Sequence, residues 1–134
     1  AQWAHTDVTR FLDFLFEHQS EAGDSGNFKN TTFTAAALYL EETRTEGAVK
    51  NAAACKRKWF ALKKIFRIIN EIKSKSGWGS WHDDFGANVN TTTADVWDRY
   101  VAKNPDAKPF RNKGWIYLEQ VEKVVPYKPR GTHV

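Results

Sequence analysis

Residues 50–76 read KNAAACKRKWFALKKIFRIINEIKSKS and are followed directly by Gly77. The stretch contains no proline and no glycine and is rich in strong helix formers, so it predicts one long helix that ends before Gly77. At about 100° per residue, most of its large apolar side chains share one face. These residues are Cys55, Trp59, Leu62, Ile65, Phe66, Ile69 and Ile72. Such a helix buries one face against other elements and presents the opposite face to solvent.

Positive charge is concentrated on the same stretch. Residues 50–76 hold nine Lys or Arg and one acid, which gives a net charge of +8. Residues 1–49 hold three basic residues and eight acids, for −5, and residues 77–134 hold eight and seven, for +1. A chain with a net charge of only +4 therefore carries its positive charge on a single element. This pattern favours a polyanion as partner, although a helix face that is merely solvated has the same composition.

The size and composition of the chain indicate one folded domain. A length of 134 residues is sufficient to bury a core, and an aromatic content of 14% argues against disorder. Cys55 is the only cysteine, and its place on the apolar face predicts a small buried side chain. No apolar run is long enough to span a membrane, so we expect no membrane partner.

Two helices are predicted before the basic stretch, from the spacing of their apolar residues. The first is expected over residues 7–20, with Thr6 as its N-cap and Asp7 in its first turn. The second is expected over residues 30–43, with Asn30 as its N-cap. Followed by the basic helix, this order is typical of helix-turn-helix proteins.

The chain after Gly77 has a different composition. Residues 78–93 mix Trp, Gly, Asn and Asp without periodicity, which predicts a long ordered loop. Three aromatic residues are expected to pin this loop, namely Trp78, Trp81 and Phe85. Two further helices are predicted near residues 93–103 and 115–124, and residues 126–134 are expected to be a flexible tail.

These elements predict an all-α protein with two parts. Residues 1–76 form a three-helix unit of helix-turn-helix type with a long basic third helix, and residues 77–125 form a two-helix, Trp-rich extension. The extension contains more Trp side chains than a soluble surface leaves exposed. We therefore expect it to pack on the three-helix unit, so that residues 1–125 form a single domain.

Two blocks of the sequence resemble the Myb/SANT-like DNA-binding domains of plant and fungal proteins. The first comprises Trp3, GNFKNTTF at residues 26–33 and CKRKWFALKKIF at residues 55–66. The second and more specific block is SGWGSWHDDFGANVNTTTADVWDRYVAKNPDAKPFRNKGWIYLEQV at residues 76–121. Together they cover nearly the whole chain. The resemblance implies a Myb-like helical domain, a nuclear location and DNA binding by a transcription regulator or a transposon-related protein.

The resemblance also implies which residues contact DNA. When Trp59 is aligned with the third-helix Trp of Myb-type domains, Lys56, Arg57 and Phe60 fall where such helices read bases, and the helical wheel independently places them opposite the apolar face. An Arg suits guanine and a Phe suits the thymine methyl group. Half-buried packing within the domain is the alternative for Phe60. Phosphate contacts are expected from the neighbouring basic residues Lys50, Lys63, Lys64 and Arg67. One departure is that the aromatic core candidates, Trp3, Phe33 and Trp59, are spaced more widely than in Myb repeats.

Enzymatic activity is not expected. The four His residues are scattered, no Cys/His spacing resembles a zinc site, and no phosphate-binding glycine loop or nucleophile motif is present. His82-Asp83-Asp84 is typical of turn chemistry in a Gly- and Asn-rich loop, so we expect no metal and no cofactor. The alternative to binding of double-stranded DNA is a SANT-type protein-interaction domain, which uses the acidic residues 1–49 or the Trp-rich extension.

Overall fold

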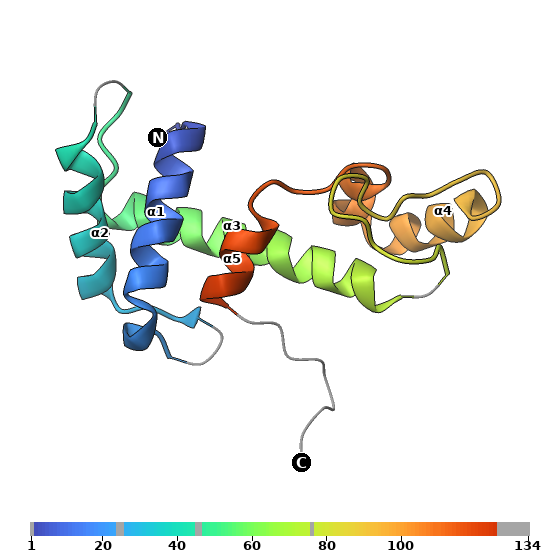
Figure 1. Ribbon diagram of the computed structural model, residues 1–134, viewed down its shortest axis with the longest axis horizontal. Coiled ribbons are helices and arrows are strands. Elements are labelled where there is room, and N and C mark those ends of the chain that lie inside the picture. The colour runs from blue at the N-terminus through green and yellow to red at the C-terminus, as the bar shows by residue number, and fades with distance from the viewer. Residues whose placement is uncertain (1, 24–25, 45–46, 76, 126–134) are drawn as a thin grey trace, which may run out of the picture. The chain divides into compact units, whose positions relative to one another are not determined.

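The computed structural model describes residues 2–23, 26–44, 47–75 and 77–125 and shows an all-α protein (Figure 1). Its helices are α1 (His5–Glu17), η1 (Gln19–Glu21), α2 (Asn30–Glu42), α3 (Ala52–Ser74), α4 (Ala94–Lys103), η3 (Pro105–Phe110) and α5 (Leu118–Val124), where η denotes a 3-10 helix. These described ranges contain no strand, only an isolated backbone pair between His82 and Gly86. The predicted all-α class is confirmed, whereas the predicted tail at residues 126–134 lies outside the described residues.

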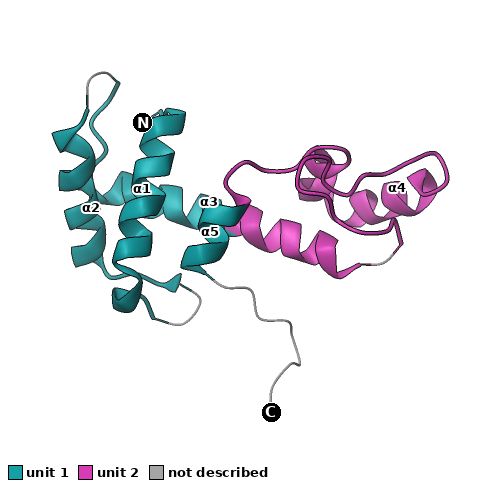
Figure 2. Cartoon of the chain, viewed as in Figure 1, with its two compact units in different colours: residues 1–63, 119–134 teal, residues 64–118 magenta. Residues whose placement is uncertain are grey.

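The chain divides into two compact units, which Figure 2 colours separately. Unit 1 comprises residues 1–63 and 119–134, and unit 2 comprises residues 64–118. The division falls within α3 and not at the end of this helix, where the sequence suggested it. Nearly all of α5 belongs to unit 1, although the sequence assigned this helix to the extension. Folding of residues 1–125 as a single domain stays a prediction.

Trp59 lies at the centre of unit 1. Figure 1 shows α1 and α2 side by side and running in opposite directions, while the first half of α3 crosses them. The Trp59 side chain is fully buried, and its indole N–H donates a hydrogen bond of 2.7 Å to the backbone carbonyl of Gly26. The Phe28 ring packs edge-on against Trp59, with 5.9 Å between ring centroids. Trp59 therefore joins α3 to the loop that precedes α2.

The last helix, α5, is attached to the beginning of the chain. The side-chain amide of Gln19 donates hydrogen bonds to the backbone carbonyls of Lys123 (2.6 Å) and Val124 (3.2 Å). Val121 and Val124 are buried as part of the same unit. Unit 1 is thus completed by a helix that follows unit 2 in the sequence.

Helix α1 begins earlier than predicted. Its N-cap is Ala4 and not Thr6, so the assignment of Thr6 is wrong. Asp7 explains the shift, because its carboxylate reaches back to accept a hydrogen bond from the Ala4 backbone N–H at 3.3 Å. Helix α2 begins at Asn30 as expected, but Lys29 holds the N-cap position and no side chain caps this end.

The core of unit 2 combines the second half of α3 with Trp residues from the following loop and α4. Trp78 and Trp97 are buried, and their rings meet edge to face with 4.9 Å between centroids. Trp81 is half-buried, 6.5 Å from the Phe110 ring. Phe85 is 53% exposed, so the expectation that it pins the loop is wrong.

Two loops of unit 2 cross without space for a side chain between them. Gly86 has a φ of +62°, and a Cβ atom there would meet the backbone carbonyl oxygens of Phe110 and Lys113. At Gly114 a Cβ atom would meet the carbonyl oxygen of Asp83. Only glycine permits this backbone approach and this φ without strain. The crossing therefore explains why the loop after Gly77 contains Gly and polar residues without helical periodicity.

Candidate nucleic-acid interface

The three residues predicted to contact bases lie exposed on one face of α3. Lys56, Arg57 and Phe60 all belong to the part of this helix in unit 1. Their spacing of three and four residues places them on adjacent turns of the same face. Cys55 and Trp59, on the opposite face, are fully buried. The amphipathic character predicted for the helix is confirmed at these positions.

Phe60 is a large apolar side chain on a face that is otherwise basic. It is 48% exposed, and the ammonium nitrogens of Lys56 and Lys63 lie 5.8 Å and 5.0 Å from its ring centroid. Both distances are within the range of cation–π interactions. The ring is thus flanked by two cations while about half of its surface stays available to a partner.

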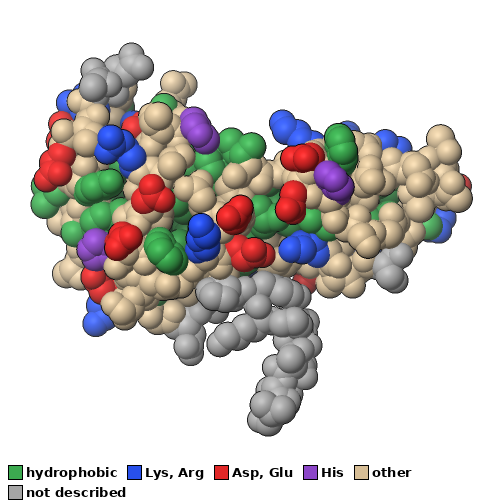
Figure 3. Space-filling view, viewed as in Figure 1, with side chains coloured by type: hydrophobic (Ala, Val, Ile, Leu, Met, Phe, Trp, Pro, Cys, Tyr) green, Lys and Arg blue, Asp and Glu red, His purple; other side chains and the backbone are tan. Residues whose placement is uncertain are grey.

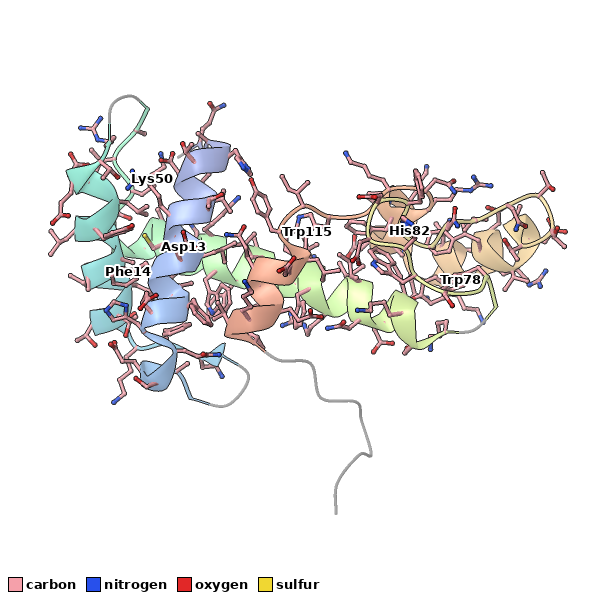
Figure 4. The ribbon with its side chains drawn as sticks, in the orientation of Figure 1. Asp13, Phe14, Lys50, Trp78, His82 and Trp115 are labelled. Carbon is pink, nitrogen blue, oxygen red and sulfur yellow. The ribbon has the colours of Figure 1, made fainter. Side chains whose placement is uncertain are left out.

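Two of the predicted phosphate contacts, Lys50 and Lys63, are buried in unit 1. Lys63 is 6% exposed, and its ammonium group donates a hydrogen bond of 2.9 Å to the side-chain carbonyl of Asn27. Lys50 is 5% exposed and lies 3.0 Å from the carboxylate of Asp7 (Figure 4). Protein groups thus already engage both ammonium groups, which argues against a phosphate contact by either lysine.

Trp3 connects the beginning of the chain to α3. The ammonium groups of Lys50 and Lys58 lie 5.7 Å and 5.8 Å from its ring centroid, and the Phe11 ring lies 5.2 Å away. Burial lowers the pKa of Lys58, because a less polar environment disfavours the charged form. Some of the positive charge in residues 50–76 therefore has a structural role within unit 1.

The other two predicted phosphate contacts, Lys64 and Arg67, are exposed on the part of α3 that belongs to unit 2. Lys64 lies 3.6 Å from the carboxylate of Asp106, and both side chains are more than half exposed. Solvent-exposed ion pairs of this kind contribute little to stability. The pair can therefore open in favour of a stronger anion.

The partners of the buried lysines were missed in the sequence. Asn27 precedes Lys63 by 36 residues, and Asp7 precedes Lys50 by 43 residues. Helical periodicity predicts contacts only between residues three or four positions apart. These two pairs form only when distant parts of the chain pack together, so the sequence pattern did not predict them. The acid Asp7 was assigned to the first turn of α1, but nothing in the sequence assigned it to Lys50.

Other reactive side chains are held in arrangements unlike those of catalytic groups. Cys55 is fully buried, and burial raises the pKa of its thiol to about 11, so the nucleophilic thiolate is scarce at neutral pH. The Nδ1 atom of His82 accepts hydrogen bonds from the backbone N–H groups of Asp84 (3.0 Å) and Phe85 (3.3 Å), which is turn chemistry. Within the described ranges, no cluster of three or more His, Cys, Asp or Glu side chains is arranged to hold a metal ion.

A scan against protein-family models gives no match for this chain, and searches of curated proteins and of solved structures give none either. The resemblance to Myb/SANT-like domains therefore stays a prediction that rests on the residues quoted above. No helix in the part of the chain that the structure describes is long and apolar enough to cross a membrane.

Proposed function

We propose that this chain is a Myb/SANT-like, helix-turn-helix DNA-binding domain that reads double-stranded DNA through Lys56, Arg57 and Phe60. The observation that supports this best is the common exposed face of α3 that these three residues share. An α-helix fits the major groove, where each base pair presents a distinct pattern of hydrogen-bonding groups. The proposal includes a nuclear location and a place in a transcription regulator or a transposon-related protein. It assigns no catalytic step to the chain.

Each residue of the face suits a different feature of the groove. The Arg57 guanidinium can donate two parallel hydrogen bonds to O6 and N7 of guanine, and Lys56 can donate to one of these atoms. Lys64 and Arg67 are proposed as phosphate contacts, which position a protein without reading sequence. The base contacts proposed for unit 1 do not depend on these two residues.

Salt titration of the intact chain tests whether phosphates are bound. With a duplex selected from a random pool, log K is expected to fall linearly with log salt, by about 0.9 for each phosphate neutralised. Lys64→Ala is expected to weaken binding to all duplexes alike and to reduce the slope by about one unit. Lys29→Ala is the matched control, since Lys29 is an exposed lysine at the start of α2 and is not part of α3. Absence of duplex binding at low salt would refute the proposal.

Replacing Arg57 tests whether a base is read. Arg57→Ala is expected to cost about 1–3 kcal/mol on the selected duplex and much less on a scrambled one, because a bidentate guanine contact forms only at the correct base. Arg57→Lys keeps the positive charge but lacks the planar guanidinium that donates two parallel hydrogen bonds. Compared with Arg57→Ala, it should restore affinity for scrambled DNA but not the preference for the selected duplex. If Arg57→Ala lowers the affinity for both duplexes equally, Arg57 contacts a phosphate and does not read a base.

The second candidate function is a SANT-type protein-interaction domain in a chromatin or regulatory complex. Figure 3 shows acidic side chains over α1 and α5, both of which lie in unit 1. On α1, Asp13 and Glu17 are exposed one turn apart, and Phe16 beside them is 45% exposed (Figure 4 labels Asp13). An acidic face next to an exposed apolar side chain complements a basic protein segment. Charge reversal at Asp13 would abolish such binding and leave the α3 face unchanged.

A further inference from the structure

The ring of Phe60 is held by a buried cation and not only by its own helix. Lys63 lies one turn after Phe60, with its ammonium group 5.0 Å from the Phe60 centroid and 5.8 Å from the Trp59 centroid. The same ammonium group donates to Asn27, in the loop before α2. The cation beneath the ring is thus fixed by a second element of unit 1. Exposed side chains on a helix surface usually lack such an attachment.

A fixed, half-exposed aromatic ring suits one particular feature of the major groove. The 5-methyl group of thymine is the apolar group that a base pair presents there, and apolar side chains including Phe contact it. The remaining groups on the base-pair edges are hydrogen-bond donors and acceptors, for which Phe60 offers no partner. The donors Lys56 and Arg57 lie on the adjacent turn of the same face.

We propose that Phe60 is the specificity-determining residue that selects thymine through its 5-methyl group, and that Lys63 is the positioning residue that holds the Phe60 ring. This inference rests on the DNA-binding function proposed above. One helical turn advances about 5 Å and one base-pair step about 3.4 Å. The selected thymine is therefore expected one or two base pairs from the guanine read by Arg57.

Removal of single methyl groups from the DNA tests the role of Phe60 directly. In the selected duplex, each thymine is replaced in turn by deoxyuridine, which differs only by the missing methyl group. The intact chain is expected to lose affinity about fourfold at one position, the factor that corresponds to one buried methyl-sized group. Substitution elsewhere in the duplex should leave the affinity unchanged.

The protein variants locate the methyl contact. Phe60→Ala is expected to bind thymine and deoxyuridine duplexes equally, because the ring that senses the methyl group is gone. Phe16→Ala removes a ring of similar exposure from α1, at 45% against 48%, and should keep the full discrimination. Persistence of the fourfold difference in Phe60→Ala would overturn the assignment of Phe60.

Lys63 is tested by substitutions that separate a positioning role from a phosphate contact. Lys63→Met removes the cation but keeps the length of the side chain, so it should remove most of the methyl discrimination and leave the salt slope unchanged. Lys63→Arg retains a cation and should retain the discrimination. A slope reduced by about 0.9 in Lys63→Met would instead make Lys63 a phosphate contact. If Lys63→Met does not fold by circular dichroism, Asn27→Ala removes the same attachment at an exposed residue.

Failure of this inference is distinguishable from failure of the proposed function. A chain that binds no duplex at low salt contradicts DNA binding and the inference together. A chain that binds a selected duplex with sequence preference, but tolerates deoxyuridine at every thymine, overturns the inference while DNA binding stands.

Discussion

Replacement of Trp59 by alanine is expected to lower the free energy of unfolding by about 3–5 kcal/mol, the range for truncation of a buried Trp or Phe. Trp59 is fully buried, its indole N–H donates to the Gly26 carbonyl, and its ring packs against Phe28. The substitution therefore leaves a cavity and also an unpaired carbonyl oxygen. Urea denaturation of the full chain, followed by circular dichroism, measures the loss.

The adjacent residue provides the control for Trp59. Phe60 follows Trp59 on α3 but lies on the exposed face, so Phe60→Ala is expected to cost less than about 1 kcal/mol. Trp59→Phe keeps most of the ring but loses the hydrogen bond, and should fall between these values. Similar losses for Trp59→Ala and Phe60→Ala would contradict the assignment of the two faces of α3.

The second large effect is expected from Asp7→Ala, at about 3 kcal/mol. The Lys50 side chain is only 4% exposed, so removal of Asp7 leaves an uncompensated charge in the interior of unit 1. Breaking a buried ion pair by removing one partner costs roughly 3–5 kcal/mol. The lower end applies here because the Asp7 side chain is 25% exposed, which admits water to the pair. Denaturation of the full chain measures this loss as well.

A double substitution shows whether the buried charge is the cause. Lys50→Met in the Asp7→Ala background removes the unpaired cation, so it should recover much of the lost stability. Asp13→Ala is the matched control, since Asp13 is exposed on the same helix and its loss should change stability by no more than about 0.5 kcal/mol. A double variant as unstable as Asp7→Ala alone would assign the loss to the start of α1, where Asp7 accepts from Ala4.

Local patterns predicted the helices well, because helical periodicity depends on neighbours three and four residues away. Helix α3 was expected over residues 50–76 and occupies Ala52–Ser74, and α4 was expected near residues 93–103 and occupies Ala94–Lys103. Thr6 failed as an N-cap because Asp7, one residue later, already satisfies the Ala4 N–H. In that case two local signals competed, and the carboxylate determined the helix start.

The candidate site was predicted less completely, since burial of a lysine depends on distant partners. Lys63 is the clearest example. At about 100° per residue, Lys63 lies only about 40° from the buried Trp59 on the helical wheel. The burial of Lys63 could therefore have been predicted from the sequence. Its charge placed it on the solvated face instead, and Asn27 became visible as its partner only in the folded chain. Lys50 precedes α3, and no wheel applies to it. Lys56, Arg57 and Phe60 are exposed where expected, whereas their contact with DNA stays a prediction.

The return of the chain to unit 1 through α5 has a consequence for the order of folding during synthesis. Residues 64–118 leave the ribosome before most of α5, so unit 1 stays incomplete until α5 has emerged as well. The bonds from Gln19 to Lys123 and Val124 close loops of more than 100 residues. Contacts between residues so distant in the sequence raise the contact order, which slows folding relative to helical bundles whose neighbours are consecutive. We therefore expect α1 and α2 to complete their packing only after α5 has been synthesised, whereas unit 2 can fold before then.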